Sequence, residues 1–233
     1  MSRFSSESCW ILHRRPWRES SLLIELFSRE HGRVGLVARG ARGARSAWRG
    51  LGEPFQPLTA SWVRRGELGS LSELESAGAR RVLSGRSLWS ALYANELLLK
   101  LLGREEPVPQ AFFAYEHLLS ELEQPDALAP ALRRFEMSLL AALGVAPDLD
   151  FEALGGEPIS AHGRYRLDPE AGFHPVAAPG RQVYSGRAIL CLAGDQAGDS
   201  ALQREMRDIT RVLIDHQLGG RSLKTRELFR STR

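Results

Sequence analysis

The sequence predicts an α+β protein, in which a small five-stranded antiparallel barrel precedes a mainly helical region. Two observations support this prediction. Short apolar segments separated by turn residues fill residues 1–80, and leucine-rich segments with helical spacing dominate the remainder. A chain of 233 residues can bury the cores of two such modules.

The barrel is predicted from five short strands. They cover residues 9–12, 20–28, 33–39, 58–63 and 69–76. Residues 13–19 are predicted to form a polar connection, because Pro16 lacks the amide that a central strand needs. Five short strands within about eighty residues are typical of a small barrel such as the OB fold.

Helices are predicted to follow the barrel. They cover residues 87–102, a segment opened by Pro109, residues 126–143, and a segment from Ser200 to about Gly219. Ser200 and Gln203 have the spacing of a capping box, which favours a helix start at Ser200.

A small irregular or β insertion is predicted within the helical region. Residues 148–185 are rich in Gly and Pro and contain only short strand-like patches. We therefore predict two domains, residues 1–80 and 81–233, with the insertion at about 148–185.

The basic charge is concentrated toward the N-terminus. Residues 1–80 contain thirteen arginines against eight glutamates, whereas the remainder has eighteen basic against twenty acidic residues. Residues 31–50 hold five arginines and no acid. Arginine suits bidentate binding of phosphate, although a GC-rich genome would also favour it over lysine. The bias permits a nucleic-acid surface without requiring one.

The arginine-rich segment nevertheless predicts such a surface. Small residues between its arginines let the backbone follow a phosphate chain, and Trp17 and Trp48 offer flat rings for base stacking. The alternative for the arginine-rich segment is a basic loop that is merely solvated. Trp48 could equally be buried in the core. For Trp62, burial in the core is the preferred interpretation. The predicted DNA-binding residues are Arg14, Arg15, Arg33, Arg39, Arg42, Arg45, Trp48, Arg49, Arg221, Lys224 and Arg226.

No motif of catalysis is evident. The sequence lacks a Gly-rich phosphate loop, a nucleophile elbow and a Cys/His pair, so we expect no enzymatic activity, cofactor or metal. Cys9 and Cys191 are too few and too far apart for a disulfide scaffold or a zinc site. Because no signal peptide or membrane-length apolar run is present, we expect a cytoplasmic, nucleoid-associated protein without a membrane partner.

Two other functions remain open at this point. Acidic residues of the insertion are conceivable ligands of a nuclease metal, although no supporting His or Lys has a recognisable spacing. These acids are Asp148, Asp150, Glu152, Asp168 and Glu170. An RNA-binding OB-fold protein is the second alternative, because composition does not distinguish it from a DNA-binding one.

Several motifs resemble the RecO family of bacterial recombination mediators. Residues 11–16 (ILHRRP), 19–22 (ESSL), 32–42 (GRVGLVARGAR) and 66–71 (GELGSL) resemble its N-terminal barrel, and residues 93–97 (YANEL), 132–136 (LRRFE) and 218–228 (LGGRSLKTREL) its helical part. The resemblance implies an OB-fold domain that binds single- and double-stranded DNA and anneals complementary strands. It also implies that the protein acts with RecR to load RecA onto SSB-coated DNA.

The insertion departs from the pattern of relatives that carry four cysteines there as a zinc module. Cys191 lies alone in an apolar stretch, and His162 and His174 have no thiolate partner at ligand spacing. We expect an insertion without zinc ligands and a buried free thiol at Cys191. Packing of Tyr165, Phe173 and Tyr184 is then expected to hold the insertion together.

The resemblance also implies that the helical domain captures the acidic, Phe-ending C-terminal tail of SSB. Arg133 beside Leu132 and Phe135 offers a cation at the edge of an apolar stripe, which suits such a tail. Alternatively, Arg133 and Arg134 form surface ion pairs with acids such as Glu136 or Glu96.

Overall fold

The computed structural model describes residues 1–43, 46, 48, 50–124, 128–196 and 198–229. The chain forms two compact units. One contains Met1–Glu123 together with Leu223–Arg233, and the other contains Gln124–Ser222. The C-terminal segment therefore returns to the unit that holds the N-terminus.

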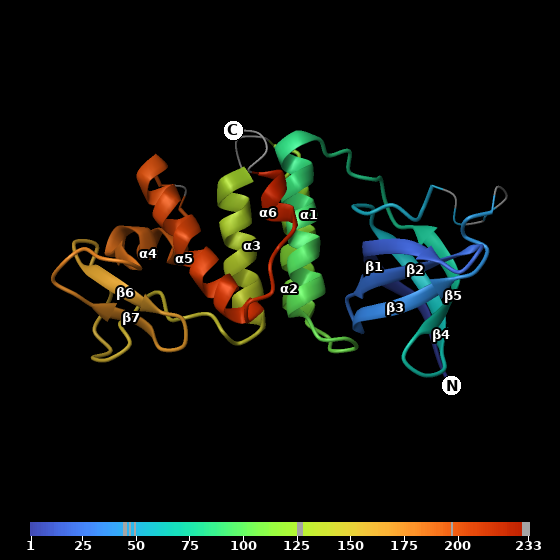
Figure 1. Cartoon of the computed structure of the whole chain (residues 1–233), viewed down its shortest axis with the longest axis horizontal. Helices are drawn as coiled ribbons and strands as arrows, with labels where there is room; N and C mark the ends of the chain where they lie inside the picture. Colours follow the sequence, from blue (N-terminus) through green and yellow to red (C-terminus); the bar gives the residue numbers. More distant parts are fainter. Residues whose placement is uncertain (44–45, 47, 49, 125–127, 197, 230–233) are drawn as a thin grey trace. The chain divides into compact units, whose positions relative to one another are not determined.

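A closed five-stranded barrel opens the chain, as predicted for an OB fold (Figure 1). Its strands are β1 (Ser2–Trp17), β2 (Ser21–Ser28), β3 (Gly32–Ala38), β4 (Leu58–Arg64) and β5 (Gly69–Ser76). Neighbours follow the order β1-β2-β3-β5-β4 around the barrel. All pairs are antiparallel except β3 and β5, which pair in parallel at Leu36 and Gly69.

Side chains alternate along the strands, and those that point inward fill the barrel. The inward side chains form one apolar cluster that includes Cys9, Ile11, Ile24, Leu26, Val34, Leu36, Leu58, Trp62, Leu71 and Leu74. Trp62 is only 1% exposed and stacks on Phe4 at a centroid distance of 4.9 Å. The preferred core position of Trp62 is thus confirmed.

The prediction of a polar connection at residues 13–19 was wrong, because β1 continues through Pro16 to Trp17. Pro16 pairs with Leu22 of β2. On its other side β1 pairs with β4 only from Ser2 to Cys9. The second half of β1 is therefore unpaired on the β4 side, and such edge positions are where strands tolerate proline.

Two helices pack on the barrel within the first unit. They are α1 (Gly85–Leu101) and α2 (Pro109–Glu121), close to the predicted segments and with Pro109 at the predicted start. Asn95 of α1 donates to the Leu12 carbonyl at 2.9 Å and accepts from the Tyr115 hydroxyl at 2.6 Å. This buried network joins β1, α1 and α2 through polar groups that are all satisfied.

The connection between α1 and α2 also adheres to the barrel. The amide of Glu105 donates to the Arg33 carbonyl at 2.9 Å, at a part of β3 that β5 does not reach. Gly32 permits this approach, because a Cβ there would lie 2.0 Å from the carbonyl oxygen of Glu106. Helices α1 and α2 are therefore fastened to the barrel at two places.

The second unit contains helices and a small sheet. Its elements are α3 (Leu128–Ala142), β6 (Arg164–Asp168), β7 (Gly172–Pro175), β8 (Val183–Ser185), α4 (Gly186–Ala193) and α5 (Ser200–Leu218). The three strands form an antiparallel sheet in the order β7-β6-β8. Tyr165, Phe173 and Tyr184 are buried, which confirms that packing by these rings supports the predicted insertion. The expected start of α3 at Asp126 lies outside the described residues.

Two local predictions in this unit need correction. The N-cap of α5 is Asp199, whose carboxylate accepts from the amides of Ala201 and Leu202, so the cap lies one residue before the predicted Ser200, which is the first residue of the helix. An aspartate at this position binds two amides that the helix leaves unpaired. Cys191 is free, as expected, but half-buried rather than buried, because it borders a cavity.

Candidate nucleic-acid interface

Two segments rich in arginine meet at one end of the barrel. They are the turn between β1 and β2 and the segment that follows β3. The amide of Arg42 donates to the Ser20 carbonyl at 3.0 Å, and its Nη1 donates to the Glu19 carbonyl at 3.0 Å and to the Arg18 carbonyl at 3.3 Å. These bonds hold the segment after β3 against the turn.

The resulting surface gathers five exposed arginines, which we call the arginine end of the barrel. They are Arg14, Arg15, Arg18, Arg39 and Arg42. Arg14 forms an ion pair with Glu53, whereas the other four have no carboxylate partner among the described residues. Arg18 was missing from the predicted site, although its place in the turn beside Arg14 and Arg15 was a visible signal. Clustered guanidinium groups create a positive potential that attracts phosphate.

Trp48 packs against the barrel core. It is half-buried, joins the inward apolar cluster, and its Nε1 donates to the Arg39 carbonyl at 3.4 Å. Its ring therefore helps close the barrel beneath the arginine end. Trp17 lies at the end of β1, and the Arg15 guanidinium carbon lies 5.5 Å from the centre of its ring.

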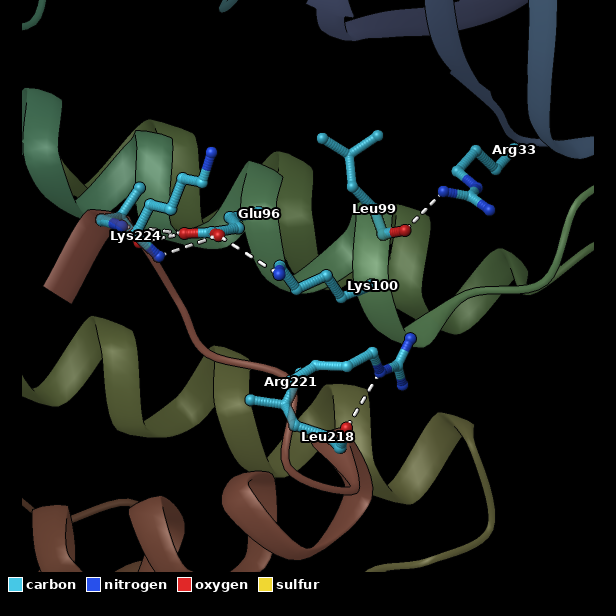
Figure 2. A network of polar contacts seen from close by, with 8 residues as sticks. Arg33, Glu96, Leu99, Lys100, Leu218, Arg221 and Lys224 are labelled. Atoms are coloured by element: carbon cyan, nitrogen blue, oxygen red, sulfur yellow. Dashed lines mark hydrogen bonds and ion pairs between the residues drawn. The ribbon is translucent and has the colours of Figure 1, made fainter.

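Arg33 lies apart from this group, at the opposite end of β3 from Arg39. Its Nη1 donates to the Leu99 carbonyl of α1 (Figure 2). Burial lowers the pKa of the Arg33 guanidinium, an effect that nearby Glu25 opposes. The half-buried side chain thus already has a protein partner, which makes it a weaker candidate for phosphate binding than the arginine end.

The remaining predicted residues fall into two groups. Arg45 and Arg49 lie outside the described residues. Arg221 belongs to the second unit, where its Nε donates to the Leu218 carbonyl at 2.9 Å and caps α5 (Figure 2). Lys224 and Arg226 belong to the first unit and flank the start of the short helix α6 (Thr225–Leu228).

A second candidate site lies within the second unit, where α3, α4 and the first half of α5 line a cavity of about 190 Å³. Its walls combine two guanidinium groups with methionine and cysteine side chains. The lining includes Arg133, Arg134, Met137, Ser138, Cys191 and Met206. A cation beside a soft apolar pocket suits a ligand that carries both a carboxylate and an apolar group.

Arg133 is the predicted residue that this cavity contains. It is only 9% exposed, and its Nη2 donates to Glu136 Oε1 at 2.9 Å, while its Nε has no hydrogen-bond partner among the described residues. The expected ion pair with Glu136 exists, but both side chains are buried rather than on the surface. Leu132 and Phe135 face the core and do not line the cavity.

Most residues that line the cavity were not predicted from the sequence. Met137 is one helical turn beyond Arg133, so helical spacing was an available signal for it. Cys191 and Met206 come from α4 and α5, and only the fold brings them to α3. Arg134 also borders the cavity and forms an ion pair with Asp195.

Some kinds of site do not occur in the described part of the chain. No group of three or more His, Cys, Asp or Glu side chains there has an arrangement suited to a metal ion. None of the helices described is both long enough and apolar enough to cross a membrane.

The fold and the first site define an OB-fold barrel with a cationic end, continued by a helical region. Comparison with protein families matches residues 1–80 to the N-terminal part of recombination protein O and residues 82–227 to its C-terminal part. The chain therefore belongs to the RecO family, whose function is DNA repair and recombination.

Individual relatives agree over nearly the whole length. The chain is 46% identical to the DNA repair protein RecO of Alkalilimnicola ehrlichii, over 96% of this chain and 90% of the relative. It is 43% identical to that of Laribacter hongkongensis, over 97% and 94% of the two chains. Identity to that of Halorhodospira halophila is 42%, with both chains fully covered.

Proposed function

We propose that this protein is a recombination mediator that binds single- and double-stranded DNA without sequence specificity and anneals complementary strands. The observation that supports this most is the arginine end of the barrel, where Arg42 fastens two exposed basic segments together. Guanidinium groups held in this way contact phosphates, which every DNA sequence presents alike.

Annealing follows from charge neutralisation. Two complementary strands repel each other through their phosphates, and a protein that neutralises part of this charge lowers the repulsion that slows their encounter. Such a mechanism uses no bond-breaking step and no bound metal. The protein then acts by binding rather than by catalysis.

The RecO relationship supports a role with partner proteins. We propose that the protein works with RecR to load RecA onto DNA coated by SSB, and that the cavity beside Arg133 receives the acidic C-terminal tail of SSB. The guanidinium of Arg133 would pair with a tail carboxylate, and Met137 and Met206 would contact its terminal aromatic ring.

Annealing in the presence of EDTA tests the first part of this proposal. Two complementary oligonucleotides, one labelled with a fluorophore and the other with a quencher, should pair faster with the protein than without it. If acceleration requires Mg²⁺ and is accompanied by strand cleavage, a nuclease is the better interpretation. Tighter binding of an RNA than of a DNA with the same sequence would instead favour an RNA-binding protein.

A further inference from the structure

The end of β1 presents a cation and an aromatic ring side by side. Arg15 and Trp17 pair with Leu23 and Ser21 of β2, and residues two apart in a strand share one face. The Arg15 guanidinium carbon lies 5.5 Å from the centre of the Trp17 ring. Arg15 is exposed and Trp17 is half-buried, and both belong to the surface around the arginine end.

The rings of the other four tryptophans pack against other parts of the protein. Trp10 and Trp62 are 1% exposed. Trp48 packs against the barrel core, and Trp89 contacts Phe229 at a centroid distance of 5.9 Å. The ring of Trp17, in contrast, contacts the exposed side chain of Arg15, which a ligand can displace.

We propose that Trp17 stacks on an unpaired base of single-stranded DNA, and that Arg15 exchanges the ring for a neighbouring phosphate. This inference rests on the proposed DNA-binding function. The exchange is favourable, because an exposed cation–π contact is weaker than stacking of a base on an aromatic ring. Arg15 then gains a charge-assisted hydrogen bond with phosphate in place of its contact with the Trp17 ring.

The exchange gives Trp17 a specific role. Bases in a duplex already stack on one another, so they are not available to the Trp17 ring, whereas the phosphates of both DNA forms are available to the arginines. Trp17 is thus the residue by which the protein distinguishes single strands from duplex. Arg18, Arg39 and Arg42 contribute to both.

Comparison of oligo-dT with an abasic oligonucleotide of the same length tests the proposal, because the two share their phosphates and differ only in bases. The wild-type protein should bind oligo-dT about tenfold more tightly than the abasic strand. Trp17→Ala should bind both strands alike and keep its affinity for duplex. Trp17→Phe should retain most of the preference, and Trp89→Phe should retain all of it.

Other outcomes contradict specific parts of the account. A Trp17→Ala protein that still prefers oligo-dT would overturn the proposal, as would loss of the preference in Trp48→Phe with Trp17 intact. Thermal unfolding shows whether Trp17→Ala folds, and Trp17→Leu, which also lacks an aromatic ring, replaces it if it does not. If the wild-type protein binds neither the abasic strand nor duplex, the proposed function itself fails.

Discussion

The carboxylate of Glu96 accepts hydrogen bonds from both the amide and the hydroxyl of Thr225, at 2.9 and 2.7 Å, across 129 residues of sequence. A third bond comes from the amide of Lys224 at 3.0 Å (Figure 2). Glu96 thus caps the start of α6 and fastens the C-terminal segment to α1. Lys100 lies one turn further along α1, 3.6 Å from the same carboxylate.

Replacing Glu96 by Gln should loosen this attachment in a pH-dependent way. Burial raises the pKa of Glu96, but the hydrogen bonds from Thr225 and Lys224 outweigh this effect and set the pKa below its ordinary value of 4.5. A lowered pKa means that the stabilisation is complete above the ordinary value and is lost as pH falls through the folded-state pKa. We expect Glu96→Gln to cost about 1 to 2 kcal/mol at neutral pH.

Urea unfolding of the wild-type protein and Glu96→Gln at neutral and acidic pH measures this difference. It should shrink at acidic pH, and hydrogen exchange at the Thr225 amide should be faster in the variant at neutral pH. Lys100→Gln is the control, because it keeps all three hydrogen bonds. A constant difference between the two proteins at every pH would show that the Glu96 charge has no part in the attachment.

The close approach of the α1 to α2 connection to β3 depends on Gly32. Gly32 has φ +64, and an added Cβ would lie 2.0 Å from the Glu106 oxygen. Gly40 has a similar φ of +68 but no atom within 4 Å of the Cβ position. We expect Gly40→Ala to cost about 1 kcal/mol from backbone strain alone, and Gly32→Ala about 3 kcal/mol or more. Equal thermal destabilisation of the two variants would argue against a tight contact at Gly32.

The cavity beside Arg133 is best tested without stranding a buried charge. Arg133→Ala would remove the cation beside the buried Glu136 carboxylate, so we choose the double variant Arg133→Met with Glu136→Met, which removes both charges together. The folded state should be nearly as stable as the wild type. Binding of a peptide with the sequence of the SSB tail should weaken by about 1 to 3 kcal/mol, measured by calorimetry. Wild-type peptide affinity in this variant would remove Arg133 from the tail site.

The two thiols should differ strongly in reactivity. Burial raises the pKa of the Cys9 thiol inside the barrel, which disfavours its reactive thiolate, whereas Cys191 is half-buried beside a cavity. A chromogenic disulfide reagent should therefore titrate Cys191 in the folded protein and Cys9 only after unfolding. Rapid reaction of the folded Cys191→Ser variant would contradict this assignment.

Local patterns in the sequence predicted the regular parts of the fold. Alternation located β5 at Gly69–Ser76, and the fixed φ of proline located the start of α2 at Pro109. Pro16 gave a wrong prediction, because a proline is excluded only from those strand positions whose amide is needed. Which positions need an amide depends on how far β4 extends along β1, and that is set by the closure of the barrel.

Sites were harder to predict, because they depend on contacts between distant segments. Arg33 and Arg39 look equivalent in sequence, yet they lie at opposite ends of β3 and only Arg33 meets the carbonyl of Leu99. The cavity beside Arg133 needs α4 and α5 to reach α3. Local periodicity does not encode those contacts. The sequence could therefore predict that arginines are abundant, but only the fold shows which arginines lie at the surface and which have protein partners.

The central claim is that the arginine end binds DNA through phosphates, and the salt dependence of oligo-dT binding tests it most directly. Three phosphate contacts contribute about 2 to the slope of log affinity against log salt for a single strand. The triple variant Arg18→Gln, Arg39→Gln and Arg42→Gln should therefore bind more weakly and with a slope flatter by about 2. Replacing Arg204, Arg207 and Arg211 of α5 by Gln removes the same charge elsewhere and should leave the slope near that of the wild type. A wild-type slope in the first variant would contradict the claim.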